Sequence, residues 1–297
     1  MQRALQSREC EGEVFATAKA SACDASVMIR LIVNADDFGF TSDVNEGIIE
    51  AHRNGILTAT TLMANGCAFD HAVALVRQTP SLDVGCHLVL VQGKSVLDPN
   101  RDLPATIPEL LRHLIARKIS VYDELSAQVR RIARAGIRPT HLDTHKHTHL
   151  LPPVLDAVAR IAHEFRIPWV RRPFDFGIAS GARITKGAVA VGMRITRPAF
   201  TRALGELRTT DHFTGFQITG SLHGPSLIET LARLPDGLTE FMCHPGKLGP
   251  ELRSAKTRLK ESREIELAAL TSTEVRAMIE RRGIELVNYR SALTERS

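Results

Sequence analysis

Short apolar runs rich in β-branched residues recur along this chain, and each is followed by a longer segment whose apolar residues have helical spacing. The first run is Leu31-Ile32-Val33, and later ones span 58–63, 82–87 and 238–243. Runs of this kind are typical of strands buried on both faces of a parallel sheet. The intervening helices supply the crossover connections that parallel strands require. The pattern therefore predicts an α/β fold.

The number of repeats narrows the architecture further. Additional strands are predicted at 140–142, 169–171, 216–218 and 284–287, and helices at 43–54, 69–77, 107–116, 122–135, 153–164, 226–234 and after Arg258. About seven or eight β/α repeats predict a closed or nearly closed (β/α) barrel. In such a barrel the active site lies at the C-terminal ends of the strands, so chemically active side chains are expected there.

One domain accounts for the whole pattern. A chain of 297 residues that is 43% hydrophobic can bury a large core, and no linker divides it, so we expect a single barrel domain over residues 28–297. Residues 1–27 lack apolar periodicity, and we expect them to be a disordered, dispensable extension.

The cysteines and the apolar runs point to a cytoplasmic location. Five cysteines without C-x-x-C spacing indicate neither a disulfide framework nor a zinc knuckle. Cys86 and Cys243 each precede a histidine, but strand alternation predicts that they are small buried residues facing away from it. No run is long enough to span a bilayer and no secretory signal is present, so a cytoplasmic protein is expected.

Charge is unevenly distributed. The formal net charge is +5, yet residues 160–208 contain ten Lys/Arg against three acids, a local excess of seven. The chain lacks the aromatic-rich basic motifs of nucleic-acid binders, so no nucleic-acid partner is expected.

The segment 178–204 mixes apolar and basic residues without a clean helical face. It is either a barrel insertion with solvated arginines or a surface for peripheral membrane contact. The oligomeric state is not predictable from the sequence.

Polar residues follow four of the predicted strands. Asp36 and Asp37 follow the first strand, His87 ends the third, Asp143 and His145 follow the strand at 140–142, and His244 follows the strand at 238–243. The barrel places all four strand ends on one rim.

The segment T-H-L-D-T-H-K-H-T-H favours a metal site. His141, Asp143, His145, His147 and His149 alternate, so an extended chain would place them on one face. Catalytic sites for zinc-like ions commonly use two or three His or carboxylate ligands and leave a position open. One aspartate, His87 and one histidine of this run meet that requirement. Alternatively, the run is a hydrogen-bonded polar strand end, and for His147 and His149 individually a supporting role is the favoured one.

The remaining polar residues suggest roles in proton transfer. Of Asp36 and Asp37, one can bind the metal while the other accepts a proton from water; capping of the next helix is the weaker alternative. His244 is a candidate to protonate a leaving amine, although a lone histidine there is more often structural. Arg171 and Arg172 are candidate oxyanion donors.

Four motifs in order, N-A-D-D-F-G, V-G-C-H-L, T-H-L-D-T-H-K-H-T-H and F-M-C-H-P-G, make the chain similar to the YdjC-like carbohydrate deacetylases over residues 31–290. The resemblance implies an irregular (β/α) barrel like that of polysaccharide deacetylases. It also implies that Asp37, His87 and His145 hold one divalent metal ion and that Asp36 is the catalytic base. The resemblance leaves the identity of the ion open among zinc, magnesium and the transition metals, although imidazole ligands make magnesium less natural.

Within that family the chain most resembles the hopanoid-biosynthesis-associated type, on F-T-S-D-V-N-E-G-I, T-A-T-T-L-M-A-N-G, H-L-V-L-V-Q-G-K and R-E-I-E-L-A-A-L-T-S. This implies deacetylation of an N-acetylglucosaminyl hopanoid, a glycolipid, with peripheral contact at the inner membrane surface. Lys146 stands where the family pattern D-S-H-H-H-V-H has a histidine, which puts a contact beside His145 in doubt. Asp143 and His147 are expected to contact substrate or to support the metal ligands. Deacetylation of chitooligosaccharides or another amide, and a non-catalytic sugar- or metal-binding barrel, are the alternatives.

Overall fold

The computed structural model describes residues 28–177 and 184–294, except for the side chains of residues 184–188 and 190. The predicted N-terminal extension lies outside the described residues. Eight strands form one sheet: β1 Ile29–Phe38, β2 Ala59–Leu62, β3 Asp83–Leu88, β4 His141–Thr144, β5 Trp169–Val170, β6 His212–Thr214, β7 Gly237–Cys243 and β8 Glu285–Leu286.

All strand pairs of this sheet are parallel. The order is β5-β4-β3-β2-β1-β7-β6, and β8 pairs with β1 near its N-terminal end. In the described residues the edge strands β5 and β6 share no ladder, but isolated bridges join Trp169 to Arg208 and Asp175 to Phe213. The sheet is therefore a curled, nearly closed barrel, which confirms the predicted irregular (β/α) fold.

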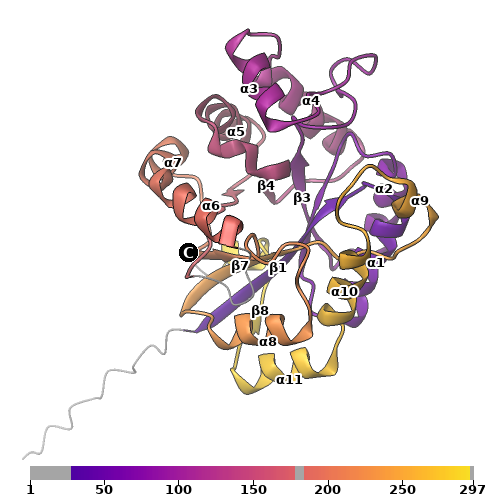
Figure 1. Ribbon diagram of the computed structural model, residues 1–297, viewed down its shortest axis with the longest axis vertical. Coiled ribbons are helices and arrows are strands. Elements are labelled where there is room, and N and C mark those ends of the chain that lie inside the picture. The colour runs from indigo at the N-terminus through magenta and orange to yellow at the C-terminus, as the bar shows by residue number, and fades with distance from the viewer. Residues whose placement is uncertain (1–27, 178–183, 295–297) are drawn as a thin grey trace, which may run out of the picture.

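The helices surround this sheet on its outer side (Figure 1). They are α1 Ser42–Asn54, α2 Phe69–Gln78, α3 Ile107–Ile115, α4 Val121–Arg134, α5 Pro152–Glu164, α6 Ile184–Ile195, α7 Arg197–Leu204, α8 Gly224–Ala232, α9 Pro250–Ser254, α10 Glu261–Leu270, α11 Thr273–Arg281 and α12 Ser291–Thr294, with a 3₁₀ turn η1 at His145–Leu150. None of the described helices is long and apolar enough to cross a membrane.

One predicted strand is wrong. The strand expected at 216–218 lies instead at His212–Thr214, and residues 216–220 form a turn. Gly215 ends the strand at φ 117°, and a Cβ there would lie 2.2 Å from the Met242 carbonyl oxygen, so only glycine fits this close approach. Phe216 lines a cavity, so its apolar side chain does not indicate a strand of the sheet.

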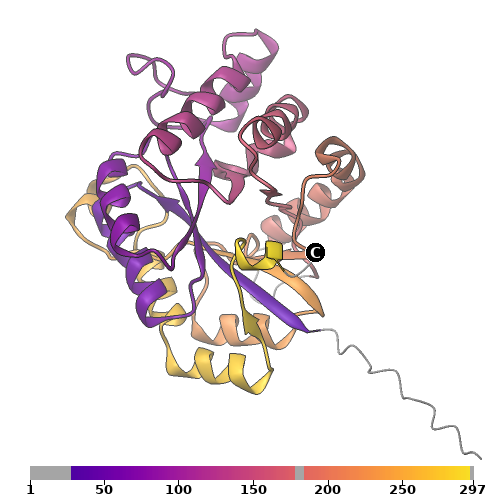
Figure 2. The same cartoon turned by 180° about the vertical axis from the view of Figure 1, so that it is seen from behind.

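The two faces of the sheet differ in chemistry. Residues that point outward, such as Val33, Cys86, Leu142 and Phe241, join the large core under the helices. Inward-pointing residues near the N-terminal end of the barrel form a second apolar cluster that includes Ile32, Trp169, Leu238 and Tyr289. The C-terminal segment, yellow in Figure 2, runs beside β1 and contributes Tyr289 and α12 to this cluster. Apolar side chains thus close one end of the barrel, and the polar residues collect at the other.

Candidate active site

Asp36 and Asp37 both reach the C-terminal end of the barrel because β1 is irregular there. Adjacent residues of a regular strand point to opposite faces. Here the pairing with β2 shifts by one residue between Ala35 and Phe38, and Asp37 adopts a left-handed backbone with φ 69°. Such a bulge re-aims a side chain without ending the strand. The strand therefore continues through both acids to Phe38, whereas the sequence suggested that it ended before them.

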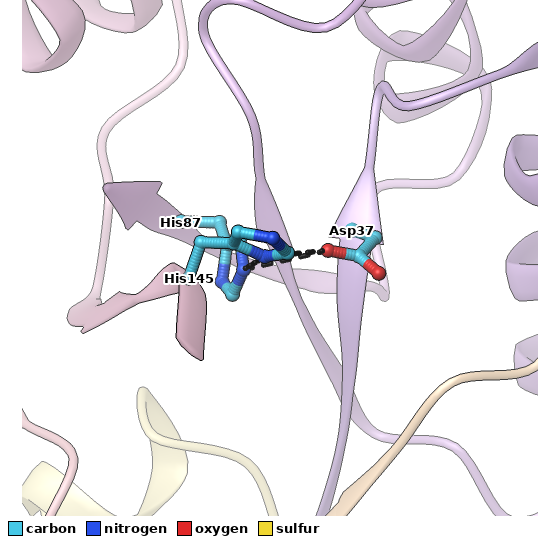
Figure 3. Close-up of side chains that lie close together, drawn as sticks. All are labelled: Asp37, His87 and His145. Carbon is cyan, nitrogen blue, oxygen red and sulfur yellow. Dashed lines mark hydrogen bonds and ion pairs between the residues drawn. The ribbon is translucent and has the colours of Figure 1, made fainter. Parts of the chain in front are cut away.

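Asp37, His87 and His145 come together at this end (Figure 3). His87 Nε2 lies 3.4 Å from Asp37 Oδ1 and 3.3 Å from His145 Nδ1, and His145 Nδ1 lies 3.4 Å from Asp37 Oδ1. Ligands at the corners of a tetrahedron around a zinc-like ion, each about 2.0–2.1 Å away, are about 3.3–3.4 Å apart. The three atoms therefore have the spacing of a metal-binding triad.

The Asp143 carboxylate orients His87. Its Oδ1 lies 2.7 Å from His87 Nδ1, while Thr61 Oγ1 donates to its Oδ2 at 3.0 Å. Burial lowers the pKa of His87, but Asp143, together with Asp36 and Asp37, outweighs burial and raises the pKa to about 9. A carboxylate on the far nitrogen of a ligand histidine fixes its tautomer, so the Nε2 lone pair faces the triad once that nitrogen is deprotonated.

Arg263 of α10 orients Asp37, as Asp143 orients His87. Its Nη2 donates a short hydrogen bond to Asp37 Oδ2. Burial would raise the pKa of Asp37, but Arg263, followed by His145 and His87, holds it well below its usual range. Asp37 Oδ1 is buried and has no hydrogen-bond donor among the described residues. The carboxylate is therefore ionised, with one oxygen free for a cation.

The charge balance also suits a cation. Buried carboxylates near the triad outnumber the buried guanidinium groups: Asp36, Asp37, Asp143, Glu240 and Glu266 against Arg171 and Arg263. An excess of buried negative charge is unfavourable unless a cation or a proton offsets it. Two imidazoles and one carboxylate suit zinc-like ions better than magnesium.

Arg171 fixes the position of Asp36. Its Nη1 and Nη2 donate to the two Asp36 oxygens at 2.8 and 2.7 Å, its Nη1 also pairs with Asp143 Oδ2 at 2.7 Å, and its Nε donates to Glu240 Oε1 at 2.7 Å. Burial raises the pKa of Asp36, but Arg171, together with His87 and His244, outweighs burial and holds the pKa well below its usual range. All three guanidinium nitrogens are engaged by carboxylates. Arg171 thus orients Asp36 and does not face the cavity as an oxyanion donor.

His244 follows β7 and lies beside Asp36. Its Nε2 is 4.0 Å from Asp36 Oδ2, and its backbone N–H donates to Glu266 at 2.6 Å. Burial lowers the pKa of His244 to about 4 despite the nearby Asp36. The imidazole is therefore neutral at pH 7 and able to accept a proton.

The alternation of the histidine run predicted that its residues share one face, but they do not. The strand ends at Thr144, and η1 follows with Lys146 and His147 in left-handed conformations at φ 56° and 52°. His147 packs edge-on against Phe213 and Phe216. His149 is buried between Thr144 Oγ1, at 2.6 Å, and the Arg171 carbonyl oxygen, at 3.1 Å. Neither belongs to the triad.

A cavity of about 870 Å³ opens above these groups. Its lining includes Phe216, Met242 and His147, together with the half-buried to exposed residues 255–260. Arg172 does not line it. Sequence reasoning missed Arg263 and the loop 255–260, because nothing in their local pattern links them to strands more than 100 residues away.

Known proteins resemble the chain along most of its length. Residues 30–281 match the model of the family described as YdjC-like protein. Carbohydrate deacetylases of Brevibacillus brevis and Geobacillus stearothermophilus are 35% and 34% identical, over 88% and 87% of this chain and 98% and 96% of theirs. A crystal structure from Enterococcus faecalis V583, whose name refers to cellobiose-phosphate cleavage, superposes with a TM-score of 0.72 at 28% identity, covering 89% of this chain and 99% of the other.

Proposed function

The chain is a carbohydrate deacetylase of the YdjC-like family, and we propose that it works with one divalent metal ion to remove the N-acetyl group from an N-acetylglucosamine-type sugar. The observation that carries this proposal is the triangle of Asp37, His87 and His145 atoms beside the arginine-held carboxylate of Asp36. One group of residues can hold a cation while the neighbouring carboxylate remains free for proton transfer.

The triad would hold the metal through Asp37 Oδ1, His87 Nε2 and His145 Nδ1. When bound, such an ion supplies Lewis acidity, which lowers the pKa of water and polarises an acetamide carbonyl. Arg263 keeps Asp37 ionised and oriented for this role. Because its Nη1 has no partner among the described residues, Arg263 is also our candidate donor to the developing oxyanion, in place of Arg171.

Asp36 and His244 would move the proton. Asp36 stays ionised beside Arg171 and accepts the proton of the attacking water. His244 Nε2 lies close to the same carboxylate, and as a neutral imidazole it can take up that proton and deliver it to the leaving nitrogen. The products are acetate and a free amino sugar.

The proposed substrate is lipid-linked, an N-acetylglucosaminyl hopanoid. The sequence motifs of the hopanoid-associated type support this, as does α6, whose Val189, Val191 and Ile195 side chains are exposed. Arg194 of the same helix donates to the Asp175 carbonyl oxygen at 2.7 Å, and the Asp175 carboxylate accepts from the backbone of Phe216, a cavity residue. An exposed apolar helix joined to the cavity wall suits peripheral contact with a membrane that carries the substrate. A chitooligosaccharide or another amide remains the alternative substrate.

Acetate release tests the proposal. We would compare a soluble N-acetylglucosamine oligomer with a lipid-linked N-acetylglucosamine, using metal-loaded and chelated protein. The expected result is release that needs metal and is faster with the lipid-linked sugar. Equal rates with and without metal would refute metal dependence, and a preference for the soluble oligomer would refute the lipid-linked substrate.

Asp36→Asn separates an enzyme from a sugar-binding barrel. The variant should retain metal and lose about 100-fold or more in turnover, since a positioned base typically contributes that much. Asp98→Asn, at an exposed position outside the cavity, is the matched control and should keep full activity. Sugar binding without acetate release by the unmodified protein would favour the non-catalytic alternative.

A further inference from the structure

A buried hydrogen-bond network reaches Asp36 through the interior of the barrel, from a histidine that the proposed chemistry does not use. Asn34 lies two residues before Asp36 on β1, so both side chains point into the barrel. Asn34 Nδ2 donates to Asp36 Oδ1 at 3.1 Å, and Asn34 Oδ1 lies 2.9 Å from Nε2 of His141. Nδ1 of His141 lies 2.9 Å from Thr140 Oγ1. Since β2 and β3 separate β1 from β4 in the sheet, this network crosses the interior and does not run along a strand.

The imidazole of His141 is packed in a fixed position. Asn34 and His141 are both 0% exposed. The Tyr289 ring stacks on the imidazole, with the ring centroids 3.8 Å apart and an interplanar angle of 19°. Gly85 of β3 also adjoins it, and a Cβ there would lie 2.6 Å from three atoms of the ring, so glycine is required to make room. The packing therefore leaves the two ring nitrogens to determine what His141 does.

The charged groups allow one arrangement of protons in this network. Arg171 donates to both oxygens of the Asp36 carboxylate, so the Asn34 amide must present its NH2 group to Oδ1. Asn34 Oδ1 then requires a donor, which is the Nε2–H of a neutral His141. Burial and the Arg171 charge lower the pKa of His141 well below its usual range, despite the opposing effect of Asp36. Nδ1 is left to accept from the Thr140 hydroxyl.

The network makes the two oxygens of Asp36 unequal. Oδ1 accepts from Arg171 Nη2 at 2.7 Å and from Asn34 Nδ2 at 3.1 Å. Among the described residues, Oδ2 accepts only from Arg171 Nη1, at 2.8 Å. A carboxylate oxygen has about two lone-pair sites, so Oδ1 is filled and Oδ2 keeps one. Oδ2 is also the oxygen that lies 4.0 Å from His244 Nε2.

We propose that Asn34 and His141 are positioning residues that make Oδ2 the proton-accepting oxygen of Asp36. The inference rests on the proposed deacetylase function. The attacking water gives its proton to Oδ2 while its oxygen forms the bond to the acetamide carbon, and Oδ2 passes the proton to His244. Asn34 holds the carboxylate in the orientation for this transfer, and His141 prevents the Asn34 amide from turning its oxygen toward Asp36. Neither Asn34 nor His141 lines the cavity, so both act through Asp36.

Substitutions of His141 test the proposal. His141→Phe keeps a ring against Tyr289 but removes the Nε2–H donor, whereas His141→Gln retains an N–H donor. For acetate release from the soluble oligomer or the lipid-linked sugar, whichever reacts faster, His141→Phe should lower kcat by about 10- to 100-fold, as does misplacement of a reacting group. KM and metal content should stay nearly unchanged, and His141→Gln should recover most of kcat. Val287→Ala is the matched control, because it removes apolar contacts from the Tyr289 cluster and no hydrogen bond of the network.

A double variant separates positioning from general damage to the core. Asn34→Leu should lower kcat by a similar factor, and Asn34→Leu with His141→Phe should be no slower than Asn34→Leu alone, because both residues act through one hydrogen bond to Asp36. Replacing both partners of a buried hydrogen bond by apolar groups also leaves stability nearly unchanged. Losses that add, a loss that His141→Gln does not restore, or an unchanged kcat would overturn the proposal.

Nitrogen NMR of the imidazoles examines the network without turnover. The unmodified protein should show the Nε2–H tautomer of His141, identified by the signals that His141→Phe lacks. The Nδ1–H tautomer or a protonated ring at pH 7 would contradict the proposed network even in a protein that releases acetate. The Nε2–H tautomer in a protein that releases no acetate would retain the network and refute the deacetylase function alone.

Discussion

The floor of the cavity and its rim are both built from charged side chains, yet their charges are arranged in opposite ways. On the floor, Asp36, Asp143 and Glu240 share the single guanidinium of Arg171, and all of these groups are buried. The rim consists of the exposed cavity-lining residues Lys146, Lys256 and Arg258, which have no carboxylate partner in the described part of the chain.

Solvent explains this difference. A buried charge without a partner is strongly destabilising, so the floor must satisfy its carboxylates within the protein. An exposed charge is solvated and tolerates the absence of a partner, so the rim cations are stable without neighbouring carboxylates. Substitutions on the floor should therefore affect metal binding and folding, whereas those at the rim should leave both nearly unchanged.

The largest expected effect follows from removal of a triad residue. Asp37→Ala, His87→Ala and His145→Ala should each lose bound metal and reduce activity by about 100-fold or more, since even supporting partners of metal ligands contribute about 10- to 100-fold. Metal content by elemental analysis and acetate release are the measurements. His147→Ala is the control and should retain metal, because His147 lies outside the triad. Full metal occupancy in any triad variant would remove that residue from the site.

Arg171→Met should be the most destabilising substitution on the floor. It leaves three buried carboxylates without their shared cation, and breaking a buried ion pair in this way costs about 3–5 kcal/mol. Denaturant unfolding of metal-free protein measures the loss. An unfolding free energy within error of the unmodified protein would show that the carboxylates take up protons and do not need the guanidinium.

Metal binding should strengthen as pH rises toward 9. Without metal, Asp143 and the nearby Asp36 and Asp37 overcome the effect of burial and raise the pKa of His87 from 6.5 to about 9, so the metal must displace a proton below that pH. The same shift stabilises the metal-free fold fully below pH 6.5, and that stability is lost as pH rises through about 9.

Asp143→Asn tests whether Asp143 is a source of the raised pKa of His87. The variant should weaken metal binding by about 10- to 100-fold and move its pH dependence to lower pH. Calorimetric titration of zinc between pH 6 and 9.5 supplies both readings. An unchanged pH profile in the variant would mean that the proton is held elsewhere than on His87.

The smallest effect is expected for stability at the rim. Lys256→Gln and Arg258→Gln should change the free energy of unfolding by no more than about 0.5 kcal/mol, as is usual for exposed positions. Metal content should also be unchanged. A loss of metal or a large drop in melting temperature would show that the rim supports the floor, and the contrast between the two regions would then fail.

Much of the barrel and the triad could be predicted from the sequence. Apolar runs identify strands, and parallel strands present their C-terminal ends together, so polar residues such as Asp37, His87 and His145 could be placed on one edge. The strand at 216–218 was mistaken because a cavity-lining turn and a buried strand have the same apolar composition. The expectation that His147 and His149 share a face with the other histidines was also wrong, because alternating residues share a face only while the chain stays extended.

The sequence by itself determined which residues stand at the strand ends, because periodicity and strand direction are local properties of the chain. Only the tertiary structure decided how these residues are used. The bulge that turns Asp37 toward His87, the sharing of Arg171 by three carboxylates, and the approach of Arg263 across 226 residues of sequence all depend on crossover connections. Charges pair according to distance and burial in space, and neither quantity is encoded in the spacing of residues along a single strand or helix.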